Sequence, residues 1–86
     1  MNEIWKFELG TEKIKQIEMP TVKNILSVQV QNGVAYLWVL LDTEGTLQTY
    51  TFLTYGTGWP IAASPVLGSF IGTYQLPGLV FHVFEA

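Results

Sequence analysis

One stretch decides the fold of this chain: Ile25 to Asp42, with the sequence ILSVQVQNGVAYLWVLLD. Apolar and polar residues alternate over Ile25–Gln31, which is typical of a β-strand with one dry face and one polar face. Asn32-Gly33 follows, and both residue types tolerate the positive φ angles of a type I′ turn, so we expect a β-hairpin. The returning strand, Val34–Asp42, is apolar on both faces and should therefore lie centrally in a sheet with cover on each side.

The two strands of this hairpin differ in what should cover them. In the first strand, Leu26, Val28 and Val30 are predicted to form the dry face. In the second strand, one face should meet the domain core. The other face requires the N-terminal hairpin, the loop at 56–69 or a second subunit.

The same period-two pattern continues on both sides of the hairpin, and Gly, Pro and polar turns separate the strands. Short connections favour antiparallel neighbours, because parallel ones need long crossovers. The sequence therefore predicts an all-β single domain over 1–86, a small antiparallel β-sandwich or partly open barrel of about seven strands. The exception is the loop at 56–69, where Ser64-Pro65 suggests one helical turn at 65–68. The other predicted strands are Ile4–Leu9, Ile14–Met19, Leu47–Tyr55, Phe70–Leu76 and Leu79–Glu85.

The composition is rich in apolar residues and poor in charge. Apolar residues make up 49% and charged residues 13% of the 86 residues, and no lysine or arginine follows Lys23. Such a surface favours homo-oligomerisation, which would cover the additional apolar area. A net charge of −3 argues against binding to a nucleic acid polymer, which needs clustered cations. The longest apolar run, Val34–Leu41, is too short to cross a membrane, and the N-terminus does not read as a signal peptide, so we expect a soluble cytoplasmic protein.

The titratable residues are too few for most site chemistry. One histidine and no cysteine cannot form an ordinary metal site, and Asp42 with Glu44 falls short of a calcium site. We therefore predict no cofactor and no enzymatic activity, since a nucleophile, a base and an orienting group are not in evidence. His82 is either a hydrogen-bonded, partly buried residue or a group that contacts a ligand or senses pH.

The most site-like segment is Tyr55 to Pro60. Its glycines allow close approach of a ligand or partner, and its aromatic residues offer rigid contact area. The alternative is a glycine-bridged loop with Trp59 tucked into the core; likewise Gly72-Thr73 could be a strand passing close to another backbone. The candidate ligand- or partner-binding residues are Tyr55, Gly56, Thr57, Gly58, Trp59, Thr73, Tyr74, Gln75 and His82, with Lys6 as the candidate cation.

Several short motifs run through nearly the whole chain. They are Ile4–Phe7, Ile25–Gly33, Leu37-Trp38, Tyr55–Gly58 with Pro60-Ile61, Ile71–Thr73 with Gln75, and Leu79–Glu85. Together they resemble a family of small proteins encoded by bacteriophages and prophages, whose function is unknown. The resemblance implies a phage accessory protein that acts in the cytoplasm of the infected bacterial host.

Two functions follow as hypotheses from this resemblance and from the composition. The first is a non-enzymatic, homo-oligomeric binding protein that counters host defence by sequestering a signalling nucleotide or by occupying a host-defence protein. The alternative is a small virion or assembly structural protein, since a charge-poor β-sandwich suits packing against copies of itself.

Overall fold

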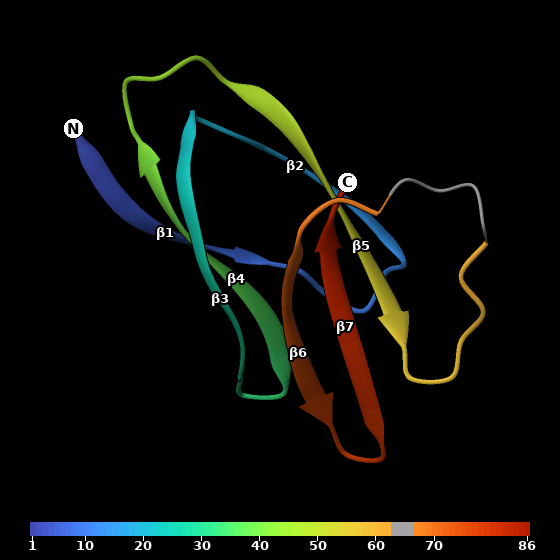
Figure 1. Cartoon of the computed structure of the whole chain (residues 1–86). Coiled ribbons are helices and arrows are strands. Elements are labelled where there is room, and N and C mark those ends of the chain that lie inside the picture. The colour runs from blue at the N-terminus through green and yellow to red at the C-terminus, as the bar shows by residue number, and fades with distance from the viewer. Residues whose placement is uncertain (63–66) are drawn as a thin grey trace.

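Seven strands and their connections make up the computed structural model, which describes residues 1–62 and 67–86 (Figure 1). The described residues form no helix, and none of them therefore crosses a membrane as a helix. The helical turn predicted at 65–68 begins on residues outside this part of the chain. The strands are β1 (Asn2–Glu8), β2 (Ile14–Met19), β3 (Val22–Gln31), β4 (Val34–Asp42), β5 (Gln48–Gly56), β6 (Phe70–Leu76) and β7 (Leu79–Glu85).

The strands form two antiparallel sheets. One has the order β1-β4-β3 and the other the order β2-β5-β7-β6. The sheets face each other without closing into a barrel, so the sandwich predicted from the sequence is confirmed and the open barrel is not formed. The hairpin turn between β3 and β4 is also confirmed, because Asn32 and Gly33 have φ angles of 53° and 78°.

The core lies between the two sheets and is built from alternate residues of each strand. In β4 the inward residues are fully buried and their neighbours are half-buried, as the apolar pattern predicts. In the facing sheet, Phe52 of β5 and Phe81 and Val83 of β7 complete the core. The inward residues of β4 are Ala35, Leu37, Val39 and Leu41.

Of the dry face predicted for β3, Val28 alone is buried, whereas Leu26 and Val30 are 44% and 37% exposed. The pairing with β4 shifts between Val22 and Asn24 and again between Ile25 and Ser27. The second shift is a β-bulge that re-aims the side chains before it. Ile25 therefore packs against the core with Val28, whereas Leu26 is exposed.

The two sheets come closest at the strands β3 and β6. A methyl group built on Gly72 of β6 would lie 3.6 Å from the Cβ of Val28 in β3, so the glycine allows this close approach. Figure 1 shows these two strands side by side, whereas β1 reaches away from them toward the N-terminus. The two sheets therefore approach each other most closely along the edge formed by β3 and β6. Strands β1 and β2 are the edge strands on the opposite side.

Candidate functional site

His82 lies at the centre of a hydrogen-bonded cluster on the face of the four-stranded sheet that is turned away from the core, called here the outward face. In the ladder it lies between Tyr55 of β5 and Thr73 of β6. Its Nε2 is 2.7 Å from the Oγ1 of Thr57, and its Nδ1 is 3.0 Å from the Oγ1 of Thr73. A neutral imidazole donates to one of these hydroxyls and accepts from the other.

This His82 cluster joins three segments of the chain, and it brings the Thr57 hydroxyl within hydrogen-bond reach of the imidazole. Both ring nitrogens are occupied by threonine hydroxyls, and neither of these contacts is with a carboxylate. A catalytic triad needs a third, orienting group on the base. The arrangement therefore suits hydrogen bonding to a ligand or partner more than acyl transfer.

Tyr55 provides an aromatic floor beside the cluster. Its ring is 4% exposed and meets Phe84 edge-on, with 6.5 Å between the ring centroids. The Nζ of Lys13 lies 5.4 Å from the centroid of the Tyr55 ring, within the range of a cation–π contact. Lys13 is therefore the lysine that lies beside this face, and sequence reasoning missed it. Only strand pairing could have placed it there, since its carbonyl oxygen accepts a hydrogen bond from the N–H of Thr54.

Trp59 folds back over Gly56 at the end of β5. A methyl group on Gly56 would lie 2.6 Å from the Trp59 ring, so only glycine fits. The indole meets Phe81 edge-on at 5.8 Å and remains 46% exposed. Gly58 supplies the turn, with a φ of 85°. Trp59 therefore packs on the rim of the core, as one of the two alternatives for this segment predicted. It also lines a hollow of about 230 Å³ with Gly56 and Thr57.

The remaining candidates in β6 point in different directions. Tyr74 is buried on the core side, where it stacks on Phe81 at 5.2 Å and donates a hydrogen bond to the carbonyl oxygen of Gly10. Burial raises the pKa of the Tyr74 hydroxyl, so it stays protonated and neutral. Gln75 is exposed and lines a shallow hollow between β3 and β6. Thr73 alone joins the His82 cluster.

Lys6 lies on the outward face of the other sheet. Its Nζ is 4.4 Å from the ring centroid of Tyr36 and 5.4 Å from that of Trp38, and it donates a hydrogen bond to Gln31. Within one chain, Lys6 and His82 therefore belong to different surfaces. Tyr36, Trp38 and Leu40 are half-buried and form what we call the outward face of β4. Within the described chain, the Nε1 of Trp38 has no hydrogen-bond partner.

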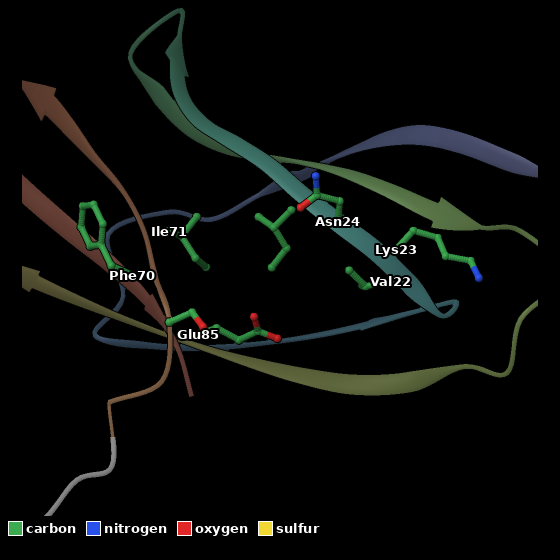
Figure 2. A pocket seen from close by; sticks show the side chains of 8 residues that line it. Val22, Lys23, Asn24, Phe70, Ile71 and Glu85 are labelled. Atoms are coloured by element: carbon green, nitrogen blue, oxygen red, sulfur yellow. The ribbon is translucent and has the colours of Figure 1, made fainter.

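A hollow of about 340 Å³ lies between the edges of β3 and β6, and Figure 2 shows it. Val22, Lys23 and Asn24 form one wall, and Phe70 and Ile71 form the other. Glu85 is the one carboxylate of its lining. No sequence pattern could have predicted this hollow, because it arises where the edges of two different sheets diverge.

In the acidic turn after β4, the Asp42 carboxylate is held by two hydrogen bonds. Asp42 accepts hydrogen bonds from the N–H of Glu44 at 3.1 Å and from the N-terminal amine at 3.3 Å. These bonds lower the pKa of the Asp42 carboxyl, the Glu44 N–H most of all. Among residues 1–62 and 67–86, no group of three or more acidic or histidine residues could hold a metal ion.

The fold and these surfaces define a small antiparallel β-sandwich with polar and aromatic surface clusters. Comparison with known families adds one assignment. The chain belongs to a family described as a domain of unknown function, DUF7352, whose profile matches residues 1–86. No curated protein and no solved structure shows a significant match to it.

Proposed function

We propose that this protein is a phage-encoded accessory protein that binds rather than catalyses, and that it acts as a homo-oligomer in the cytoplasm of the infected bacterium. The observation that supports binding is the His82 cluster with its aromatic floor. Hydroxyls, an imidazole, a buried tyrosine ring and a lysine gather there on a sheet face, and both ring nitrogens of the imidazole contact hydroxyls, not a carboxylate that would orient it as a base.

The ligand that suits this surface is a small anion with hydrogen-bonding groups, such as a signalling nucleotide. Lys13 supplies a positive charge, and Thr57 and Thr73 supply donors and acceptors. Phe70 is exposed on the same face and packs edge-on against Phe84 at 5.5 Å, so its ring offers a surface for a nucleobase. Sequestering such a nucleotide would blunt a host defence signal; occupying a host-defence protein is the other form of the same function.

Native mass spectrometry of the protein purified from infected cells tests this proposal directly, because it reports the subunit count and any small molecule that is retained. Calorimetric titration with the retained molecule, or with a panel of cyclic di- and oligonucleotides, then measures the affinity. We expect Lys13→Ala to weaken binding about tenfold, the loss of one charge-assisted contact. His82→Ala should also weaken binding, because it releases the hydroxyls of Thr57 and Thr73 that the imidazole holds in place.

Lys6→Ala is the matched control, since it removes a lysine with a cation–π contact on the other sheet. An affinity lost in the Lys6 variant and kept in the Lys13 variant would move the site to the outward face of β4. Purified protein that carries no small molecule and binds none of the panel would contradict nucleotide sequestration. A host protein that co-purifies would then support the alternative, in which the protein occupies a host-defence protein.

A second candidate function is a small virion or assembly protein, and the outward face of β4 favours it. An aromatic sheet face that the described chain leaves half-exposed is suited to packing against copies in an assembly. Mass spectrometry of purified virions separates the two functions. A stoichiometric amount in the particle supports the structural role, whereas absence from the particle supports the accessory role.

A further inference from the structure

Strand β1 is an open edge of the three-stranded sheet. It pairs with β4 on one side, and no strand of the described chain pairs with its other side. The N–H of Leu9 donates to Ala35 and the N–H of Thr43 donates to Met1, so the odd-numbered residues bond to β4. The N–H and C=O groups of the even-numbered residues therefore point to the open edge. These residues are Asn2, Ile4, Lys6 and Glu8.

The edge of β1 lacks two of the features that prevent strand addition, although it carries the charged residues Glu3, Lys6 and Glu8. It contains no proline, and its pairing with β4 has no bulge. Two other edges are irregular: β3 is shifted twice in its pairing, and β6 is shifted between Phe70 and Gly72 and lies against β3. The edge of β2 is regular but shorter, with six residues against seven in β1, and Pro20 follows it directly. Among the edges that the structure describes, β1 is therefore the best template for another strand.

Each face of β1 carries one exposed apolar residue among exposed polar and charged ones. Ile4 is 61% exposed on the outward face. Trp5 alternates onto the core side but is still 37% exposed. An added strand would therefore cover apolar side chains above and below the sheet as well as satisfy the backbone.

We propose that β1 pairs antiparallel with β1 of a second copy across a two-fold axis, with Trp5 opposite Trp5 of the second copy. This inference rests on the self-association in the proposed function and names its surface. In a symmetric pairing centred on Trp5, even-numbered residues of one copy lie opposite even-numbered residues of the other. The N–H and C=O groups that point to the open edge of one copy therefore meet those of the other copy. The Trp5-centred register overlaps the whole of β1.

The charge pattern of β1 fits this register and its own copy. Lys6 falls opposite Ile4 and Glu8 opposite Asn2, so each charge on the outward face meets an uncharged residue. A shift that centres the pairing on Lys6 would set two ammonium groups opposite each other, which is destabilising. The Trp5-centred pairing also places the outward faces of β4 from both copies on the same side of one continuous sheet.

Single-cysteine variants test this interface cleanly, because the natural chain has no cysteine. Opposed residues of a pair without hydrogen bonds have Cα atoms about 4.5 Å apart, which suits a disulfide. We expect Trp5→Cys to form a disulfide-linked dimer on mild oxidation, more than tenfold faster than Gln16→Cys on the open edge of β2. Equal rates, or faster linking through Phe7→Cys, would overturn the Trp5-centred interface.

A second pair of variants leaves Trp5 in place. Ile4→Pro removes one N–H from the open edge of β1, and Gln16→Pro removes the equivalent N–H from β2; proline is tolerated at such edge positions. Sedimentation velocity should show Ile4→Pro as a monomer and Gln16→Pro as a dimer, with circular dichroism confirming that both are folded. If both variants remain dimeric, the β1 interface is wrong but the proposed self-association stands. If the natural protein is a monomer, both are wrong.

Discussion

Strands β4 and β5 are interior strands of their sheets, and their outward faces are treated differently. In β5 the outward residues Leu53 and Tyr55 are only 8% and 4% exposed, although neither belongs to the core between the sheets. In β4 the outward residues Tyr36 and Trp38 are partly buried, with the ammonium group of Lys6 over their rings.

The difference teaches that a strand with two apolar faces need not be covered twice by its own chain. The chain supplies the cover of β5 in part through Phe84 and Lys13. For β4 the described chain supplies one lysine and no second layer; the self-association that we propose is one way to cover this face. The proposed pairing of β1 with β1 of a second copy would not cover this face, but it would join the outward faces of β4 from both copies into one larger surface.

The largest effect is expected from the inward face of β4. Leu37 is completely buried against the second sheet, so Leu37→Ala should lower the free energy of unfolding by about 3–5 kcal/mol through lost burial and a cavity. Urea denaturation measures this change. A loss below about 1 kcal/mol would mean that the two sheets do not pack as described, since even an Ile→Val truncation in a core typically costs about that much.

The outward faces can be compared through two leucines, Leu53 of β5 and Leu40 of β4. Leu53→Ala should cost about 2–3 kcal/mol, because its side chain is nearly inaccessible, and Leu40→Ala only about 1 kcal/mol in the monomer. Urea titrations at low protein concentration give both values. Equal losses would show that β4 is covered as fully as β5 within one chain, which removes the contrast.

Gly56→Ala probes how the end of β5 is closed. The added methyl group meets the Trp59 ring, and displacing this ring from Phe81 should destabilise the fold by about 1–3 kcal/mol. Replacing Trp5 and Trp38 with phenylalanine leaves Trp59 as the single fluorophore, whose emission should shift to longer wavelength in the Gly56 variant. The same alanine at Gly33, where nothing lies within 4 Å, tests the backbone strain of a positive φ without such a clash, and it should leave the emission unchanged.

The smallest effect concerns the turn that follows β4. Hydrogen bonds from Glu44 and from the N-terminal amine lower the pKa of Asp42 below its ordinary value of 3.8. The charged form of Asp42 therefore stabilises the turn above that value, and this contribution disappears as the pH falls through the lowered pKa. An NMR titration should show the Glu44 amide signal moving with this pKa in the natural protein and staying still in Asp42→Asn.

Much of the fold could be predicted because strand patterns and turn residues are local. The pattern of β4 and the Asn32-Gly33 turn each depend on neighbours in the sequence, and the structure confirms both. The pattern of β3 failed at Leu26 because a bulge is a property of the pairing with β4 and not of β3 itself. The assignment of strands to two sheets likewise depends on packing that no single segment encodes.

The candidate site was predicted in part for the same reason. Thr57, Thr73 and His82 were named from their segments, and strand pairing brings them into contact. Lys6 and Tyr74 were named with them, but Lys6 lies on the other sheet and Tyr74 faces the core. Lys13 was missed because its position beside Tyr55 depends on the pairing of β2 with β5.

Amide hydrogen exchange at two protein concentrations tests the central claim most directly. If a second copy covers the open edge of β1, the amides of Asn2, Ile4, Lys6 and Glu8 should exchange more slowly as the concentration rises. The amides of Gln16 and Glu18 at the β2 edge should keep their rates. Exchange from β1 that is as fast at high concentration as at low would contradict the claim.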